Sequence, residues 1–211
     1  MKRLDRRTCL DLMIAVLWIS QFALFFLPRL LIPAENYHLV HHPLDDLIPL
    51  WTPAAIPYYL WYIGLVGTPL YTFFKDREAY RSYIYYALWG YGAAIVVYML
   101  YPTAIAFRPD GITGDDIFTR MVAFIYTIDT PTNVLPSLHV TMAAGIALGL
   151  GAAKPFRKPL PRVILWLFAL SVAASTVLIK QHSVLDTLAA APVCLIGGLL
   201  FFHKKKNKPQ D

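Results

Sequence analysis

Charged residues are scarce in this sequence. Asp, Glu, Lys and Arg make up 15% of the 211 residues, whereas soluble domains contain about 25%. Hydrophobic residues make up 57%, and long apolar runs recur along the chain. This composition excludes an ordinary soluble domain and indicates a membrane protein.

Cysteine is nearly absent as well. Cys9 and Cys194 lie far apart, near or within apolar segments, so we interpret them as small buried hydrophobic residues and not as a disulfide. No cysteines have the spacing of metal ligands. No serine has the flanking glycines of a nucleophile elbow, which disfavours a serine hydrolase built on Ser137, His182 and Asp186.

The excess of positive charge does not have the pattern of a nucleic-acid binder. The net charge is +6, but Lys and Arg fall in short clusters between apolar runs and form no patch interleaved with aromatic residues. We therefore expect no nucleic-acid partner. Six segments reach the length of about 20 residues that a membrane-spanning helix needs. We predict an all-α fold, a bundle of six transmembrane helices in a single integral-membrane domain over residues 1–211, with spans near 11–32, 55–74, 82–102, 136–153, 162–180 and 184–202.

The distribution of Lys and Arg predicts the orientation of this bundle. Of the 19 basic residues, 15 lie on the side of the N-terminus and 4 on the opposite side. The positive-inside rule then places both termini in the cytoplasm. Loops 33–54 and 103–135 and the short joint at 180–183 would lie outside.

The stretch IKQHSVLD, residues 179–186, places polar residues between the last two apolar segments. Together these segments are about twice as long as one spanning helix, so the chain must turn here at the outer surface. His182 then enters the last span, with Asp186 one helical turn further on the same face. A carboxylate can hold an imidazole in one tautomer, which makes His182 a candidate base or nucleophile. The plainer alternative is a structural polar pair.

Two further patterns project to the same outer face. PSLH places Ser137 and His139 where the fourth span begins, and the free N–H groups and positive dipole end of a helix start favour an anion there. Arg108 offers a planar guanidinium suited to phosphate oxygens. His139 adds a second imidazole that could donate a proton. Together these groups fit phosphoryl transfer, with a helix cap at Ser137 and an outer-loop cation at Arg108 as plainer alternatives.

The motifs RP, PSxH and SxxxxxxHxxxD, in this order and with these separations, resemble those of the type 2 phosphatidic acid phosphatase superfamily of membrane lipid phosphatases. The resemblance covers a catalytic core at about residues 101–190. It implies that His182 attacks phosphorus and forms a phosphohistidine, that Asp186 orients His182, and that His139 protonates the leaving alcohol. It implies no metal and no other cofactor.

The resemblance also implies a set of phosphate-binding residues, with two departures. Arg108 and Ser137 match, and Ser175 of the third motif is either a further phosphate ligand or a small packing residue. The family's first motif usually starts with a lysine where this chain has Tyr101, and its third motif usually has an arginine where this chain has Thr176. Lys180, beside His182, is a candidate replacement for one of these missing cations.

Two outer-loop stretches contain other polar groups. The histidines and aspartates of NYHLVHHPLDD, residues 36–46, suggest a metal site, but their spacing fits no single helix face and we predict a solvated loop. Residues 115–130 are spaced like an amphipathic helix lying on the outer surface, with Asp115 and Asp116 at its start.

The sequence thus predicts an integral-membrane phosphatase of a bacterial plasma membrane, acting on the extracytoplasmic side. Its expected partners are membrane lipids and a lipid phosphate monoester or diphosphate as substrate. A phosphotransferase that passes the phosphoryl group or a phospho-headgroup to an acceptor alcohol remains an alternative. So does a non-catalytic lipid transporter or scaffold. Neither the individual lipid nor the oligomeric state follows from the sequence.

Overall fold

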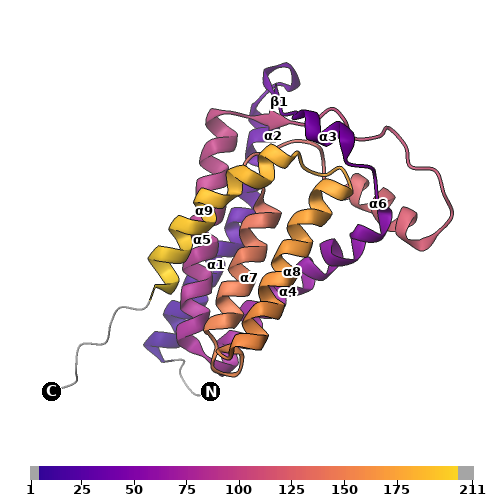
Figure 1. Ribbon diagram of the computed structural model, residues 1–211. Helices are drawn as coiled ribbons and strands as arrows, with labels where there is room; N and C mark the ends of the chain where they lie inside the picture. The colour runs from indigo at the N-terminus through magenta and orange to yellow at the C-terminus, as the bar shows by residue number, and fades with distance from the viewer. Residues whose placement is uncertain (1–4, 204–211) are drawn as a thin grey trace.

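The computed structural model describes residues 5–203, and almost all of its regular structure is helical (Figure 1). The described α-helices are α1 (Arg6–Phe25), α2 (Leu27–Leu31), α3 (Pro43–Leu47), α4 (Ala55–Lys75), α5 (Arg77–Leu100), α6 (Ile117–Ile128), α7 (Leu138–Ala152), α8 (Pro159–Leu178) and α9 (Val184–Phe202). Short 3-10 turns are η1 (Ala34–Asn36), η2 (Thr52–Ala54) and η3 (Lys154–Phe156). The two-residue strands β1 (His38–Leu39) and β2 (Thr103–Ala104) pair in parallel, with His38 opposite Thr103. The all-α prediction is confirmed.

Each of the six apolar segments forms a helix of at least 15 residues. Four helical stretches in the described part of the chain are long and apolar enough to cross a membrane: Arg6–Leu31, Arg77–Leu100, Pro159–Leu178 and Val184–Phe202. Helix α4 has 21 residues, but its many Tyr, Trp, Pro and Gly residues lower its hydropathy. Helix α7 has 15 residues and is about 22 Å long, shorter than the roughly 30 Å hydrocarbon core. The helix of the first segment starts earlier than expected, at Arg6, and ends at Phe25. Phe26 separates it from the short helix α2, which contains Pro28.

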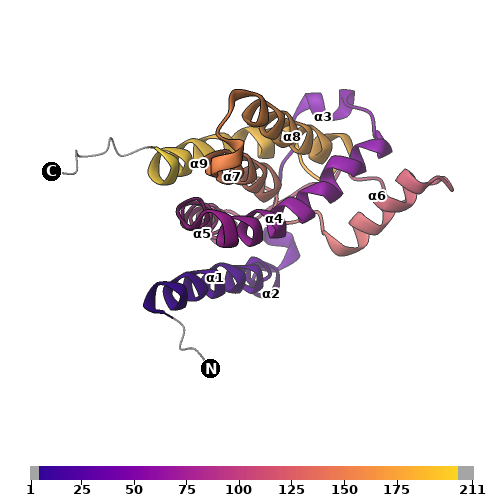
Figure 2. The same cartoon turned by 90° about the horizontal axis from the view of Figure 1, so that it is seen from below.

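Helix α7 is the central element of the bundle. It packs against α4, α5, α8 and α9, whereas α1 packs mainly against α5 on one side of the bundle (Figure 2). The α7 sequence LHVTMAAGIALGLGA contains mostly small residues, which let neighbouring helices approach closely. The first turn of α7 therefore lies inside the bundle, and polar side chains there are enclosed by other helices.

The loops that carry the predicted site residues gather at one end of the bundle. Helix α1 begins and α9 ends at the opposite end, as the prediction of two termini on one side requires (Figure 1). The long connections before α4 and before α7 are joined by the β1–β2 pair and by a hydrogen bond from the Asn133 N–H to the Thr103 carbonyl. The predicted outer helix is present as α6, and Asp116 is its N-cap. Helix α6 packs against α4 and η2.

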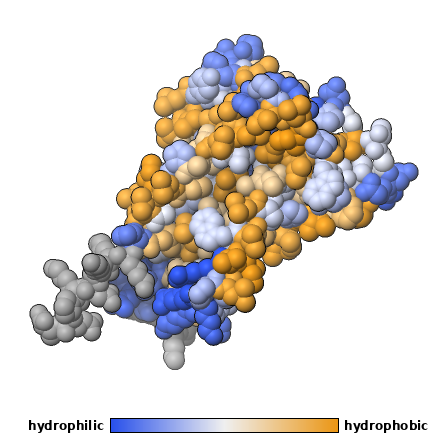
Figure 3. Space-filling model, in the orientation of Figure 1, coloured by the Kyte–Doolittle hydropathy of each residue, from blue (hydrophilic) through white to orange (hydrophobic). Residues whose placement is uncertain are grey.

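The outer surface of the bundle is apolar. Hydrophobic side chains cover most of the face in Figure 3, and hydrophilic side chains gather toward its ends. Large apolar side chains on α1, α4, α8 and α9 are more than half exposed, among them Val16, Ile63, Leu167 and Leu199. An aqueous surface would disfavour so much exposed apolar area, whereas lipid accepts it.

Candidate active site

His182 is positioned by a tight joint between α8 and α9. Lys180 has a φ of 56°, in the left-handed region, and the N–H groups of Gln181 and His182 both donate to the Thr176 carbonyl, at 2.8 and 3.0 Å. This reversal directs the His182 ring back into the bundle. Helix α9 begins at Val184, so His182 lies just before the helix and not within its first turn as expected.

Asp186 belongs to a capping box at the start of α9. The Ser183 hydroxyl caps the helix, and Asp186 Oδ2 accepts the Ser183 N–H at 2.8 Å. The same oxygen lies 3.2 Å from His182 Nδ1. Because a carboxylate beside Nδ1 favours a proton on that nitrogen, Nε2 of His182 is left with its lone pair. The helix start thus determines which nitrogen of His182 can act as a nucleophile.

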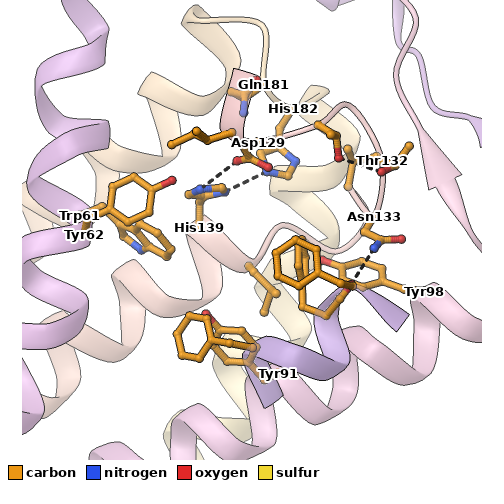
Figure 4. A pocket seen from close by; sticks show the side chains of 17 residues that line it. Trp61, Tyr62, Tyr91, Tyr98, Asp129, Thr132, Asn133, His139, Gln181 and His182 are labelled. Carbon is orange, nitrogen blue, oxygen red and sulfur yellow. Dashed lines mark hydrogen bonds and ion pairs between the residues drawn. The ribbon is translucent and has the colours of Figure 1, made fainter. Parts of the chain in front are cut away.

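His139 meets His182 from the first turn of α7. Ser137 is the N-cap of α7, so His139 is the second residue of the helix. Its Nδ1 lies 3.2 Å from His182 Nε2, and both rings are buried. The two imidazoles that the sequence placed at the ends of separate segments are therefore in direct contact (Figure 4).

Asp129 completes the arrangement, and the sequence analysis did not single it out. It is the C-cap of α6, and its Oδ2 lies 3.6 Å from His139 Nε2 and accepts a 2.5 Å hydrogen bond from the Tyr58 hydroxyl. His139 thus lies between Asp129 and His182 (Figure 4). The signal available in the sequence was a lone acidic residue at the end of an amphipathic helix, directly before the TPTN turn.

Arg108 supports this cluster from the side. One guanidinium nitrogen donates to the Asp129 backbone carbonyl at 2.8 Å, and another donates to the Gln181 side-chain oxygen. Gln181 in turn donates to the Tyr58 hydroxyl at 3.3 Å. Burial lowers the pKa of Arg108 from its ordinary value, while the nearby Asp129 carboxylate opposes this shift, and an arginine remains charged at neutral pH. Arg108 is therefore linked to the histidines through Gln181, Tyr58 and Asp129.

A cavity of about 170 Å³ opens beside the two imidazoles. Aromatic side chains from α1, α4 and α5 form its apolar wall: Phe22, Phe25, Trp61, Tyr62, Tyr91 and Tyr98. Its polar wall is formed by Asp129, Thr130, Thr132, Asn133, Gln181 and the two histidines. The cavity can therefore hold a molecule that has one polar end and one apolar end.

The sequence matches the family model of the PAP2 superfamily over residues 35–200, well over half of the chain. The chain belongs to the PAP2 superfamily. This membership confirms the resemblance found from the motifs and makes the protein, in general terms, a membrane phosphoesterase of the phosphatase and phosphotransferase type. Searches of curated proteins and of solved structures give no match.

This PAP2 protein departs from the usual motifs at Tyr101 and Thr176. Neither side chain lines the cavity, and neither is a cation. Tyr101 is exposed and stacks on His38, with ring centres 4.2 Å apart. Thr176 is buried, and its hydroxyl donates to the Ala173 carbonyl. Neither position supplies a cation to the histidines.

Lys180 and Ser175 are not brought to the cavity. The Lys180 amine donates to the backbone carbonyls of Asp45 and Ile48, and lies 5.7 Å from the centre of the Phe107 ring. Its side chain thus fixes the loop before α4 onto the α8–α9 joint. The Ser175 hydroxyl is buried within α8 and donates to the Val172 carbonyl at 2.7 Å. This is the geometry of a packing residue.

Asp45 corrects the prediction of a solvated loop at residues 36–46. Its carboxylate is buried and accepts three hydrogen bonds, from the Ser183 hydroxyl at 2.6 Å, the Val184 N–H at 2.9 Å and the His42 N–H at 2.8 Å. Burial alone would raise the pKa of Asp45, but these hydrogen bonds outweigh burial and lower it. Asp45 therefore stabilises the start of α9 directly behind His182. Among residues 5–203, no group of three or more His, Cys, Asp or Glu side chains is arranged to hold a metal ion.

Proposed function

We propose that this PAP2 protein cleaves a lipid phosphoester through a phosphohistidine at His182. The observation that carries the proposal is the contact of His182 Nε2 with His139 at the edge of a cavity that has a polar and an apolar wall. Asp186 leaves the lone pair of His182 on Nε2, the nitrogen that faces His139. An oxyanion held between the two rings would replace the present hydrogen bond between them.

His139 is the proposed proton donor to the leaving oxygen. Its two nitrogens face the Asp129 carboxylate and the lone pair of His182, and a proton on each nitrogen would satisfy both neighbours. After His182 attacks phosphorus, the bond to the leaving oxygen breaks and that oxygen takes a proton from His139. Water, or an acceptor alcohol in a phosphotransferase, then attacks phosphorus and gives a proton to His139, while the bond from phosphorus to His182 Nε2 breaks. Residues of this chain perform each step, which supports a metal-independent reaction.

We further propose the setting of this reaction. All six long helices would span the membrane with both termini in the cytoplasm, and the cavity would lie near the extracytoplasmic face of a plasma membrane. The clustering of basic residues on one side of the bundle supports this orientation. The apolar surface of the helices and the aromatic wall of the cavity support a lipid as substrate. The apolar part of the lipid would lie against Trp61, Tyr91 and their aromatic neighbours.

The test is replacement of His182 by Ala in the purified, detergent-solubilised protein. A panel of phospholipids that covers both monoesters and diesters would be supplied, and the released lipid alcohol measured. Loss of the nucleophile should reduce turnover by about 10³-fold or more. The matched control is His41→Ala, because His41 is an exposed histidine paired with Asp46 outside the cavity. Full turnover by the His182 variant, with an unchanged circular dichroism spectrum, would show that His182 is not the nucleophile.

A further inference from the structure

The charge balance of the cavity differs from that of a site built for a strongly negative phosphate. Among the described residues that line the cavity, Asp129 is the one carboxylate, and none is a Lys or an Arg. Asp129 lies on the His139 side of the cavity, where the leaving group of a bound phosphate ester would be (Figure 4). Any phosphate held by the two histidines therefore experiences a nearby negative charge.

The basic residue closest to the cavity offsets the charge of Asp129 but adds no positive surplus. Arg108 is adjacent to Asp129, and its guanidinium donates to the Asp129 carbonyl and to Gln181. One positive and one negative charge then leave this part of the site without a surplus. The Lys180 amine is held by two backbone carbonyls of the loop before α4. Tyr101 and Thr176 supply no cation and do not line the cavity.

Phosphate esters differ in how much negative charge they bring to such a site. A phosphate monoester has a charge of about −1.5 to −2 at pH 7, because its second pKa is near 6. A diester has a single negative charge. In a partly buried site, each extra unit of charge within a few ångströms of a carboxylate weakens binding about tenfold or more. A protonated His139 can balance one negative charge but not two.

We infer that the substrate is a phosphodiester lipid, whose phosphate joins the lipid alcohol to a second alcohol, and not a monoester or a diphosphate. This inference rests on the proposed function and assigns its substrate class. It departs from the lead expectation drawn from the sequence, a monoester or diphosphate, and agrees with the alternative in which a phospho-headgroup is transferred. It is compatible with transfer of the phospho-headgroup as well as with hydrolysis, since the same phosphohistidine that carries the headgroup precedes both.

The surroundings of His139 indicate which ester bond breaks. The His139 ring packs on Trp61 and Tyr58, with ring centres 4.5 and 4.6 Å apart, so it lies where the polar wall of the cavity meets the apolar wall. The oxygen that His139 protonates is then the oxygen of the lipid alcohol. His182 Nε2 bonds to phosphorus, the phosphorus–oxygen bond to the lipid breaks, and the second alcohol stays on the phosphohistidine. Attack by water releases the phospho-headgroup and restores both rings.

The experiment compares lipids that share both acyl chains and yield the same product. Dioleoyl phosphatidic acid is the monoester, and dioleoyl phosphatidylglycerol, phosphatidylethanolamine and phosphatidylcholine, supplied one at a time, are the diesters. Dioleoylglycerol is measured for each, with the wild-type protein and with Asp129→Asn. We expect the wild type to use at least one diester better than the monoester. We expect Asp129→Asn, which removes the charge and keeps an acceptor for Tyr58, to raise the monoester-to-diester ratio of kcat/KM about tenfold or more.

Two comparisons keep the result interpretable. Asp115→Asn removes an exposed carboxylate outside the cavity and should leave the ratio unchanged. In the wild type alone, the preference for the diester should shrink as the pH falls below about 6, because the monoester then loses its second charge. A wild-type preference for phosphatidic acid that neither Asp129→Asn nor pH alters would overturn the diester inference and leave the phosphohistidine mechanism standing. No dioleoylglycerol from any of the four lipids would overturn the proposed function and the inference together.

Discussion

Replacing Asp45 by Asn tests whether the loop before α4 stabilises the catalytic end of α9. Asp45 Oδ2 accepts hydrogen bonds from the His42 N–H and the Ser183 hydroxyl, and Oδ1 accepts the Val184 N–H. An asparagine has a single oxygen. If that oxygen takes the place of Oδ2, the NH2 group faces the Val184 N–H; if it takes the place of Oδ1, the NH2 group faces the His42 N–H. Either way, one donor faces another donor. The Ser183 hydroxyl can rotate, but a backbone N–H cannot.

The expected loss of stability follows from the number of hydrogen bonds that the asparagine cannot accept. One partly buried backbone N–H is left without an acceptor, which costs about 1–3 kcal/mol in the free energy of unfolding. For a chain of this size, thermal midpoints shift by roughly 2–4 °C per kcal/mol. We therefore expect the midpoint of Asp45→Asn in detergent to fall by about 5 °C. Asp46→Asn is the matched control, because Asp46 is exposed and its ion pair with His41 contributes little.

The pH dependence of this difference has a defined sign. The pKa of Asp45 is lowered in the folded protein, so the stability that its carboxylate contributes is fully present above the unfolded pKa, about 3.9. That contribution is lost as the pH falls through the folded pKa. The gap between wild type and Asp45→Asn should stay constant from neutral pH down to about pH 5 and shrink below about pH 4. Equal midpoints for the Asp45 and Asp46 variants at pH 7 would refute the assignment of Asp45 as a buried support.

The parts of the site that could be predicted were those governed by distance along the chain. Apolar length indicated the six helical segments, and the excess length of the last two indicated the turn at His182. The pattern PSLH placed Ser137 and His139 at the start of a helix, and in the structure Ser137 is the N-cap of α7 and His139 is in its first turn. Because the ends of alternate spans lie on one membrane face, the two histidines were expected at the same end of the bundle. Their 3.2 Å contact agrees with that topology.

The parts that could not be predicted depend on partners far away in sequence. Asp129 meets the Tyr58 hydroxyl across 71 residues, and Asp45 meets Ser183 across 138 residues. Locally, each looks like an ordinary helix-end or loop carboxylate. Lys180 illustrates the opposite error, because adjacency to His182 suggested a shared site. Its left-handed backbone turn sends the two side chains in different directions.

Three substitutions test packing away from the cavity. Asp11 is buried and accepts hydrogen bonds from two arginines of α5, from Arg81 Nε at 2.6 Å and from the Arg77 guanidinium at 2.9 Å. Asp11→Asn should lower the free energy of unfolding by about 1–3 kcal/mol, a moderate loss because the arginines are only partly buried. Unchanged denaturation in detergent would show that Asp11 does not stabilise the contact between α1 and α5. Gly145→Ala would place a Cβ 2.7 Å from a ring carbon of Tyr86. That ring cannot move aside easily, because it is fully buried and its hydroxyl donates to an α7 carbonyl at 2.9 Å. We expect a loss of about 1–3 kcal/mol. Gly67→Ala, with no atom within 4 Å of the new Cβ, should instead stabilise its helix by about 0.5–1 kcal/mol. If both glycine variants shifted the thermal midpoint in the same direction, close approach of α5 to α7 would not be the reason for glycine at 145.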